Sequence, residues 1–284
     1  MSPRLRTPSG EDALALAERA ARAAGALITE RFPLSPSSPE SARRIGLELK
    51  DGWNNLVTAV DRAAEDAVLA VLRAAAPTWG VIAEESGSHE GEGALRWMVD
   101  PLDGTRNFAS GIPQVAVNVA LLDGDEPVIG VTYDPIRDEC FSAEAGHGAT
   151  LNGEPMRVQD VANPEGAVFG FDMGYSGPGG HLLLELIHDL WPRMQSVRMM
   201  GSAALGVAYA AAGRFGIYAH HLVQPWDIAP GLLLVREAGG VVSDLRGGRC
   251  MPESGAIVAA GPALHAVFME RTATTPWRAS NYRG

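Results

Sequence analysis

The sequence predicts an α/β fold in which helices and sheets alternate in layers. Two amphipathic helical segments, over residues 11–32 and 58–76, precede the first long strand, and they predict a helical layer that covers a sheet. Short strands joined by turns follow over residues 115–153, which predicts antiparallel pairing. From residue 181 onwards helices and strands alternate, as in a doubly wound sheet with helices on both faces.

Start and stop signals bound the N-terminal elements. Ser9 is a candidate N-cap for the first helix, which Pro33 ends, and Asp61 falls in the first turn of the second helix. Residues 34–41 and 51–55 are expected to be loops, because Ser, Pro, Gly and Asn favour turns. Between these loops, alternating apolar residues predict a short strand or hairpin arm: Ile45, Leu47 and Leu49.

Apolar runs and turn residues assign the remaining elements. A short strand over residues 79–83, a loop over 87–94 and a central strand over 95–99 precede the antiparallel strands. The tail from Thr272 is expected to be poorly ordered. The second half is expected to run in this order: helix 181–191, strand 195–200, helix 202–212, strand 214–219, helix 226–238, strand 240–243, strand 256–260 and helix 262–271.

A glycine-rich stretch over residues 164–180 marks a change in composition between the two halves of the chain. We therefore expect two lobes. The first is an α+β lobe over residues 1–163, and the second is an α/β lobe over residues 164–284.

The composition limits the classes of function. A chain of 284 residues that is 46% hydrophobic and 20% charged is ordinary for a soluble globular enzyme. A formal net charge of −11 argues against nucleic-acid binding through a basic surface. The two cysteines, Cys140 and Cys250, form neither a disulfide framework nor a cysteine-based zinc site. We find no signal peptide and no membrane-spanning apolar stretch, so a cytoplasmic location without a membrane partner is expected.

The segment over residues 97–108 carries the most informative pattern. An apolar run predicts a buried strand end, and Asp100 and Asp103 then stand at its carboxyl end. Two carboxylates this close repel each other unless a cation such as a hard divalent metal ion neutralises them. Gly104 and Thr105 can open a helix whose free N–H groups face an anion. Taken alone, the same residues also fit a simple turn.

Further acidic residues fall at the ends of predicted elements. Glu84 and Glu85 follow a strand, and Asp61 and Asp227 open helices. Each has a structural interpretation, since the two aspartates can cap helices and the two glutamates can lie in a solvated loop. In α/β sheets, however, strand carboxyl ends and helix amino ends line one crevice. Together these acidic groups favour a magnesium-assisted phosphate site.

In these motifs the sequence resembles the inositol monophosphatase family of magnesium-dependent, lithium-sensitive phosphatases. Residues 97–108 are close to the family's W-x-x-D-P-[IL]-D-G-T-x-N-F, and residues 225–231 read P-W-D-I-A-P-G. Residues 83–86 match G-E-E-S with Ala83 in place of Gly, and residues 50–61 and 198–205 match two further motifs. The resemblance covers nearly the whole chain. It implies the αβαβα sandwich of the fructose-1,6-bisphosphatase type.

The resemblance implies a site for two or three Mg²⁺ ions. A first ion would be held by Glu84, Asp100 and the backbone carbonyl of Leu102. A second ion would be held by Asp100, Asp103 and Asp227, and a third, weaker one would lie near Glu84. The first lobe would then carry most of the metal-binding motifs, and the second lobe would complete the active site.

The resemblance also implies the roles of the remaining site residues. Thr105 and Asp61 would orient the attacking water, and Glu84 would assist through its metal ion. The backbone N–H groups of Gly104 and Thr105 would hold phosphate oxygens. Four residues would contact the substrate: Asp103, Ala203, His220 and Asp227.

The substrate is the least defined part of the prediction. Asn107, after the Gly-Thr step, resembles the inositol and sugar phosphatase branch. His220 departs from the Glu with which inositol-specific members bind substrate hydroxyls, and a neutral imidazole does not replace a carboxylate that accepts two hydrogen bonds. Asn55 replaces an Asp of the mobile loop, which removes a charge near the third ion. Arg198 is expected to be a salt-bridged core residue.

The expected function is hydrolysis of a small polyol, sugar or amino-alcohol monophosphate, as in an inositol-1-phosphatase-like enzyme. Histidinol-phosphate phosphatase and fructose-1,6-bisphosphatase-like activities are the enzymatic alternatives. A regulatory or binding protein on the same scaffold is the non-enzymatic alternative. The resemblance also implies a homodimer, with a small phosphorylated metabolite as the ligand.

Overall fold

The structure is a computed structural model that describes residues 4–33, 48–49, 56–57, 59–159, 161–174 and 177–279. Within these ranges the helices are α1 (Ala13–Arg31), α3 (Ala59–Ala75), α4 (Thr105–Ala109), α5 (Gly177–Leu190), α6 (Ala203–Ala211), α7 (Pro225–Glu237), α8 (Pro262–Arg271) and α9 (Pro276–Ala279). Short 3₁₀ turns are η2 (Pro164–Gly166), η3 (Trp191–Arg193) and η4 (Pro252–Ser254). None of the described helices is long and apolar enough to span a bilayer.

The described strands form two large sheets and one small hairpin. The first sheet contains β3 (Gly80–Ala83), β4 (Gly87–His89), β5 (Leu95–Asp103), β6 (Ala116–Asp123), β7 (Glu126–Asp134), β8 (Glu139–Glu144), β9 (Ala149–Leu151) and β10 (Glu154–Pro155). The second sheet contains β11 (Val168–Asp172), β12 (Ser196–Met199), β13 (Ile217–His220), β14 (Val241–Ser243) and β15 (Ile257–Ala260). The hairpin pairs β1 (Glu48–Leu49) with β2 (Leu56–Val57).

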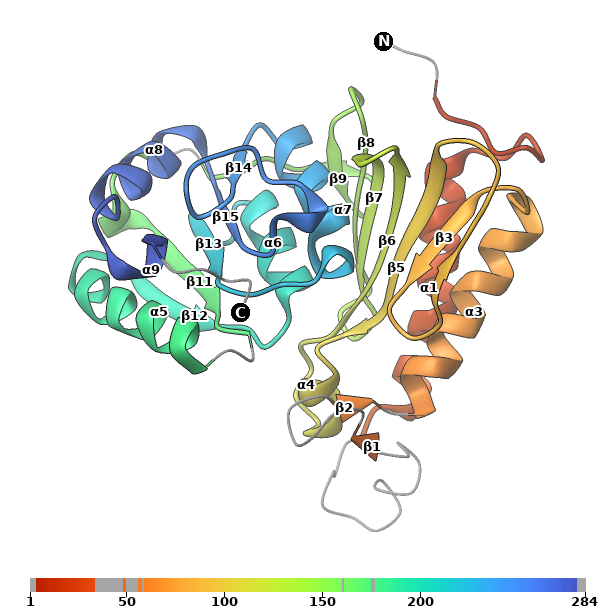
Figure 1. The fold of residues 1–284 in the computed structure, drawn as a ribbon, viewed down its shortest axis with the longest axis horizontal. Helices are drawn as coiled ribbons and strands as arrows, with labels where there is room; N and C mark the ends of the chain where they lie inside the picture. Colours follow the sequence, from red (N-terminus) through yellow and green to blue (C-terminus); the bar gives the residue numbers. More distant parts are fainter. Residues whose placement is uncertain are drawn as a thin grey trace.

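Helices and sheets alternate in five layers, which confirms the predicted αβαβα sandwich (Figure 1). Helices α1 and α3 cover the outer face of the first sheet, and their shared core includes Leu16, Leu72 and Trp97. Helices α6 and α7 lie between the two sheets, in a core with residues of both, such as Phe141 and Tyr218. Helices α5 and α8 cover the outer face of the second sheet.

The first helical layer forms as the apolar periodicity predicts, with one correction at its start. Asp12, and not Ser9, is the N-cap of α1, because its carboxylate accepts the N–H groups of Leu14 and Ala15 at 3.0 and 3.1 Å. Ser9 lies three residues earlier and contacts the hydroxyl of Thr7 instead. A carboxylate next to the first turn is the stronger acceptor for the free N–H groups of a helix start.

The first sheet confirms the antiparallel meander and changes two boundaries. The strand order is β10-β9-β8-β7-β6-β5-β3-β4, and within it only β3 and β5 run parallel. Part of the segment predicted as a loop over residues 87–94 is strand β4, which pairs with β3. β5 continues to Asp103, with a register irregularity between Asp100 and Asp103, so the aspartates belong to the strand and do not follow it.

The pairing of β1 with β2 confirms the predicted strand arm at Glu48 and Leu49, whereas Ile45 and Leu47 lie outside the described residues. The predicted loops over residues 34–41 and 51–55, together with Asn55, lie outside the described residues.

The second sheet has helices on both faces, as predicted, but it is mixed. Its order is β12-β11-β13-β15-β14, in which β12, β11 and β13 run parallel to one another and β15 runs antiparallel to both of its neighbours, β13 and β14. Strand β11 lies inside the glycine-rich stretch that we interpreted as a boundary. Gly170 of β11 is required there, since an added Cβ would lie 2.4 Å from the ring of Phe215. The division of the chain into lobes at residues 163 and 164 stays a prediction.

The tail after Thr272 is ordered as far as residue 279, so the expectation of disorder is wrong for this part. α9 places Trp277, which is 1% exposed, against the ring of Phe268 with ring centroids 6.2 Å apart. Arg278 donates to the carbonyls of Leu245 and Met269. The aromatic side chain supplies enough apolar burial to fix a short helix that has little propensity of its own.

Helix α7 docks on the first sheet through its first turn. Pro230 lies inside α7 and has no N–H to donate to the carbonyl of Trp226, one turn earlier. Asn118 of β6 donates to that carbonyl at 3.1 Å and to the carbonyl of Asp227 at 2.8 Å. The Oδ1 atom of Asn118 accepts the hydroxyl of Thr132 at 2.7 Å. A buried amide of the sheet therefore fixes the start of α7.

Candidate metal and phosphate site

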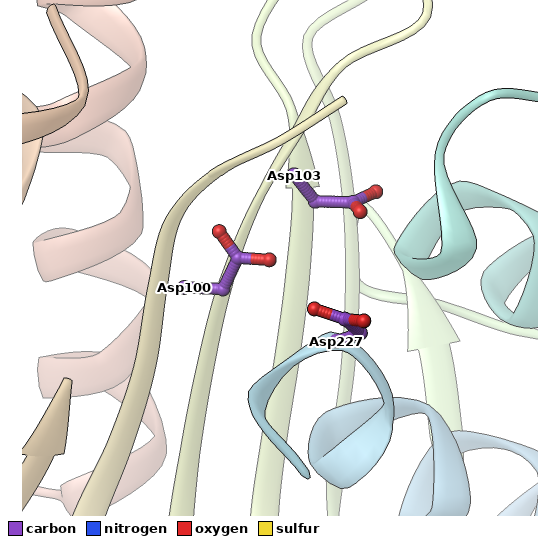
Figure 2. Close-up of side chains that lie close together, drawn as sticks. All are labelled: Asp100, Asp103 and Asp227. Carbon is purple, nitrogen blue, oxygen red and sulfur yellow. The ribbon is translucent and has the colours of Figure 1, made fainter. Parts of the chain in front are cut away.

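Three aspartates converge between the two sheets. Asp100 and Asp103 come from the end of β5, and Asp227 comes from the first turn of α7. One potential ligand atom from each lies within 4.8 Å of the others. Figure 2 shows the three carboxylates pointing toward one common space. The sequence motifs at residues 97–108 and 225–231 therefore meet as predicted.

Each carboxylate is held by donors from its surroundings. The N–H of Leu102 donates to Asp100 at 3.0 Å across the irregular part of β5. Asp103 accepts the hydroxyl of Ser202 and, at 3.1 Å, the N–H of Ala204. The N–H of Gln224 donates to Asp227 at 2.8 Å, and this bond also caps α7. These contacts orient the three side chains before any ligand binds.

The electrostatics of the cluster favour a bound cation. Burial, followed by repulsion from Glu84, Asp103 and Asp227, raises the pKa of Asp100 well above its usual value. Burial and then repulsion from Asp103 raise the pKa of Asp227. Burial also raises the pKa of Asp103 to about 6, although the hydroxyl of Ser202 opposes the shift. A divalent ion reverses this cost, and an all-oxygen donor set fits Mg²⁺.

Behind the cluster lies a hydrogen-bonded pair. The hydroxyl of Thr105 donates to Asp61 at 3.0 Å and to the carbonyl of Leu102 at 3.1 Å. Asp61 is 1% exposed and belongs to α3, so this bond joins the first helical layer to the end of β5. Gly104 precedes Thr105 with φ +87°, and a Cβ there would lie 2.8 Å from the carbonyl of Gln114. Only glycine fits this turn.

A cleft with a volume of about 360 Å³ opens over the cluster. Nine of the ten residues predicted for the site line it: Glu84, Asp100, Leu102, Asp103, Gly104, Thr105, Ala203, His220 and Asp227. The tenth, Asp61, reaches the cleft through Thr105. The structure thus brings together all ten residues. Their roles as ligands and catalytic groups stay predictions.

The expectation for Arg198 is wrong. Its side chain is exposed on the edge strand β12 and donates to the carbonyl of its neighbour Val197 at 2.8 Å. It forms no ion pair with any residue that the structure describes. An edge strand leaves its side chains open to solvent, so this position offers no buried carboxylate for the guanidinium.

Two cleft residues escaped the sequence prediction. Ser202 donates to Asp103 and also caps α6 by accepting the N–H of Leu205. Asp172, at the end of β11, accepts two backbone N–H groups and the hydroxyl of Tyr218. Burial, against the hydrogen bonds from Gly201 and Tyr218, raises the pKa of Asp172 to about 7. Ser202 lies within residues 198–205, which match a motif of the family, so the sequence offered a signal for it. Asp172 is recognisable only as the end of a strand, and the sequence analysis did not predict β11.

An αβαβα sandwich with an acidic cluster between its two sheets is the architecture of the inositol monophosphatase and fructose-1,6-bisphosphatase class of proteins. The model of the inositol monophosphatase family matches residues 10–279. The chain therefore belongs to the inositol monophosphatase family.

Curated relatives carry two kinds of name. The chain is 42% identical over 222 residues to an inositol-1-monophosphatase of Mesorhizobium japonicum, a match that covers 77% of this chain and 83% of the relative. It is 38% identical over 253 residues to the Nus factor SuhB of Salmonella typhimurium, which covers 88% of this chain and 92% of the relative. The similarity to this chain therefore covers most of the length of the inositol-1-monophosphatase and most of the length of the Nus factor SuhB.

Solved structures share the fold. The suhB protein of Bartonella henselae superposes with a TM-score of 0.86 at 34% identity, over 94% of this chain and all of that one. The IMPase of Thermotoga maritima gives a TM-score of 0.81 at 31% identity, over 92% of this chain and 96% of that one.

Proposed function

We propose that the protein is a Mg²⁺-dependent phosphomonoesterase that hydrolyses a small polyol or sugar monophosphate. The observation that carries the proposal is the convergence on one cleft of three carboxylates that are buried or partly buried, with the Thr105–Asp61 pair behind them. Burying this much negative charge is costly for a protein that binds no cation. Cation and phosphate oxygens together would balance it.

The ions would be held by side chains already oriented toward the cleft. Glu84, Asp100 and the carbonyl of Leu102 would hold one Mg²⁺, and Asp100, Asp103 and Asp227 would hold another. When bound, the ions supply charge neutralisation for the phosphoryl group and its leaving oxygen. A third ion near Glu84 completes the proposed set of two or three.

Thr105 and Asp61 would orient the attacking water. Because the hydroxyl proton of Thr105 is committed to Asp61 and to the carbonyl of Leu102, its Oγ1 atom presents only lone pairs to the cleft. These lone pairs accept a proton of the water and turn its oxygen toward the phosphorus. The N–H groups of Gly104 and Thr105 would hold phosphate oxygens, as the resemblance implies.

Water, and not a protein nucleophile, would attack the phosphorus. Cys140 and Cys250 are both buried in apolar clusters away from the residues that line the cleft. Burial raises the pKa of each thiol to about 12, so neither is a thiolate at neutral pH. The hydroxyls of Thr105 and Ser202 already donate to carboxylates.

A substrate panel tests the proposal. Inositol 1-phosphate, hexose monophosphates, histidinol phosphate and fructose 1,6-bisphosphate are incubated with and without Mg²⁺, and released phosphate is measured. We expect Mg²⁺-dependent release from at least one polyol or sugar monophosphate. Preferential release from histidinol phosphate or fructose 1,6-bisphosphate identifies the corresponding alternative. No release from any compound, together with no Mg²⁺ binding by calorimetry, refutes the enzymatic function.

The names of the SuhB relatives favour a second, non-enzymatic candidate. Those proteins are called Nus factors, so a role as a protein partner in a transcription complex is the alternative for this chain. The net charge of −11 favours protein contacts over direct nucleic-acid contacts in such a role. Homodimer formation and a cytoplasmic location remain part of the proposal, and sedimentation analysis measures the first of these.

A further inference from the structure

Helix α3 carries two buried carboxylates on the face that packs against the first sheet. They belong to Asp61 and Glu65, which lie one helical turn apart, and Glu65 is 3% exposed. The rest of this face is apolar and includes Val68 and Leu72. Burying a glutamate in such surroundings is costly unless hydrogen-bond donors compensate its charge. The bond from Thr105 accounts for Asp61, whereas Glu65 has no part in the site described so far.

Glu65 holds the segment of the chain that presents Glu84. Its Oε2 atom accepts the backbone N–H of Glu85 at 2.8 Å. One residue earlier, the N–H of Glu84 donates to the carbonyl of Val99 at 3.2 Å. Because β3 ends at Ala83, Glu84 and Glu85 lie in the turn that follows the strand. The bond to Glu65 therefore ties this turn to α3.

Together the two bonds orient the backbone on both sides of the Glu84 Cα atom. A peptide group is planar, so a hydrogen bond to its N–H orients the whole group. The group before this Cα atom is bonded to β5, and the group after it is bonded to α3. The direction of the Cα–Cβ bond of Glu84 depends on these two planes and is therefore fixed as well.

The direction of the Glu84 side chain matters because its carboxylate reaches the metal cluster. Glu84 lines the cleft. Burial and then repulsion from Glu84 raise the pKa of Asp100, so these two carboxylates lie close together. Helix α3 thus holds the pair proposed to orient the water through Asp61, and the segment of Glu84 through Glu65.

We infer that Glu65 is a positioning residue for the Mg²⁺ ion proposed at Glu84 and Asp100, because it orients Glu84 and thereby raises the affinity of the site for that ion. This inference rests on the proposed function, from which the ion site comes. Glu65 does not line the cleft, so it acts through Glu84 and not by contact with the ion. Groups that orient metal ligands from outside the coordination shell typically contribute about 10- to 100-fold to metal affinity.

Substitutions that differ in hydrogen-bonding capacity test the inference, with Mg²⁺ binding measured by calorimetry. Glu65→Leu removes the acceptor and should weaken binding of the ion about tenfold. Glu65→Gln keeps an oxygen that accepts the N–H of Glu85, so its affinity should stay within about threefold of the unmodified protein. Val68→Ala is the matched control, because it creates a cavity on the same face of α3 and lowers the melting temperature without touching this turn.

Glu84→Gln identifies the ion that Glu65 affects. If Glu65 acts through Glu84, adding Glu65→Leu to Glu84→Gln should weaken binding by no more than about twofold further. A full tenfold further loss in the double variant, or an unchanged affinity in Glu65→Leu, overturns the inference. An equal loss of affinity in Val68→Ala also overturns it, since the effect would then follow stability and not the orientation of Glu84.

Hydrogen exchange of the Glu85 amide gives a second readout, which needs neither a substitution nor activity. In the unmodified protein with EDTA, we expect this amide to exchange at least about tenfold more slowly than in an unstructured chain, because its proton is bonded to a buried carboxylate. Exchange at the unstructured rate overturns the inference even if Glu65→Leu does not fold.

The same measurements separate this inference from the proposed function. If the unmodified protein binds no Mg²⁺, the ion site is refuted and the inference falls with it. Binding of Mg²⁺ that depends on Glu65, without phosphate release from any compound of the substrate panel, supports the inference and counts against the phosphomonoesterase function.

Discussion

Replacing Asp172 with Asn isolates the cost of one buried carboxylate in the wall of the cleft. The Asp172 residue is 6% exposed and accepts the N–H groups of Met200 and Gly201 at 3.1 and 2.6 Å. The effect of burial on the pKa of Asp172 is larger than the opposing effect of these two hydrogen bonds and of the one from Tyr218. Together with repulsion from Asp103, burial raises the pKa of Asp172 from 3.8 to about 7. The folded protein therefore holds this proton more tightly than the unfolded chain.

The sign of the pH dependence follows from this shift. The stabilisation from the bound proton is complete below pH 3.8 and is lost as the pH rises through about 7. A difference of about 3 pKa units corresponds to a free energy of about 4 kcal/mol. Asn carries no charge, and its Oδ1 atom accepts the same two N–H groups while its amide donates to Tyr218. The variant should therefore gain up to about 4 kcal/mol over the unmodified protein above pH 7.

Denaturant unfolding of both proteins between pH 4 and pH 8.5, in the presence of EDTA, measures the difference. We expect the two free energies of unfolding to agree near pH 4 and to separate as the pH rises. Asp66→Asn is the matched control, because it makes the same substitution at a carboxylate that is exposed on α3. Parallel curves for Asp172→Asn and the unmodified protein would refute the reasoning.

Two other substitutions address the metal cluster and the tail. Asp100→Asn removes the carboxylate expected to bridge two ions, so Mg²⁺-dependent turnover should fall by about 10³ or more while the circular dichroism spectrum is retained; surviving activity would contradict the ligand assignment. Trp277→Ala should lower the free energy of unfolding by about 3–5 kcal/mol, because it leaves a cavity beneath α9. Trp191→Ala, at a residue that is 56% exposed, is its control, and equal losses in both would show that Trp277 does not pack as described.

Periodicity and motif spacing predicted most of the fold. The apolar stripes of α1 and α3 and the turns of the meander are local signals, and the structure confirms them. Strand β11 was missed because its centre is Gly170, which weakens any strand pattern and is needed because the rings of Phe215 and Tyr218 lie close to it in the fold. α9 was missed because its stability comes from tertiary burial of Trp277.

The site was predictable to the extent that its residues lie in contiguous motifs. Asp100, Asp103 and Asp227 could be named because each stands in a distinctive segment. The contacts that orient them could not, since Ser202 reaches Asp103 across 99 positions of the chain. The position of Asp172 could not be predicted either, because it is set by strand β11, which the local sequence does not indicate.

The missing hydrogen bond at Pro230 has a consequence for the choice of metal ion. Asn118, which occupies the vacated carbonyl, also lies directly opposite Asp100 in the pairing of β5 with β6. One neutral amide therefore connects the strand position opposite Asp100 with the backbone of Asp227, although it belongs to neither of the two motifs. Mg²⁺ demands near-ideal octahedral geometry with bonds of about 2.0–2.1 Å, whereas Ca²⁺ accepts longer and more variable ones. At the Mg²⁺ site proposed above, discrimination between these ions would therefore depend on an amide in the interior of the first sheet, one strand away from Asp100.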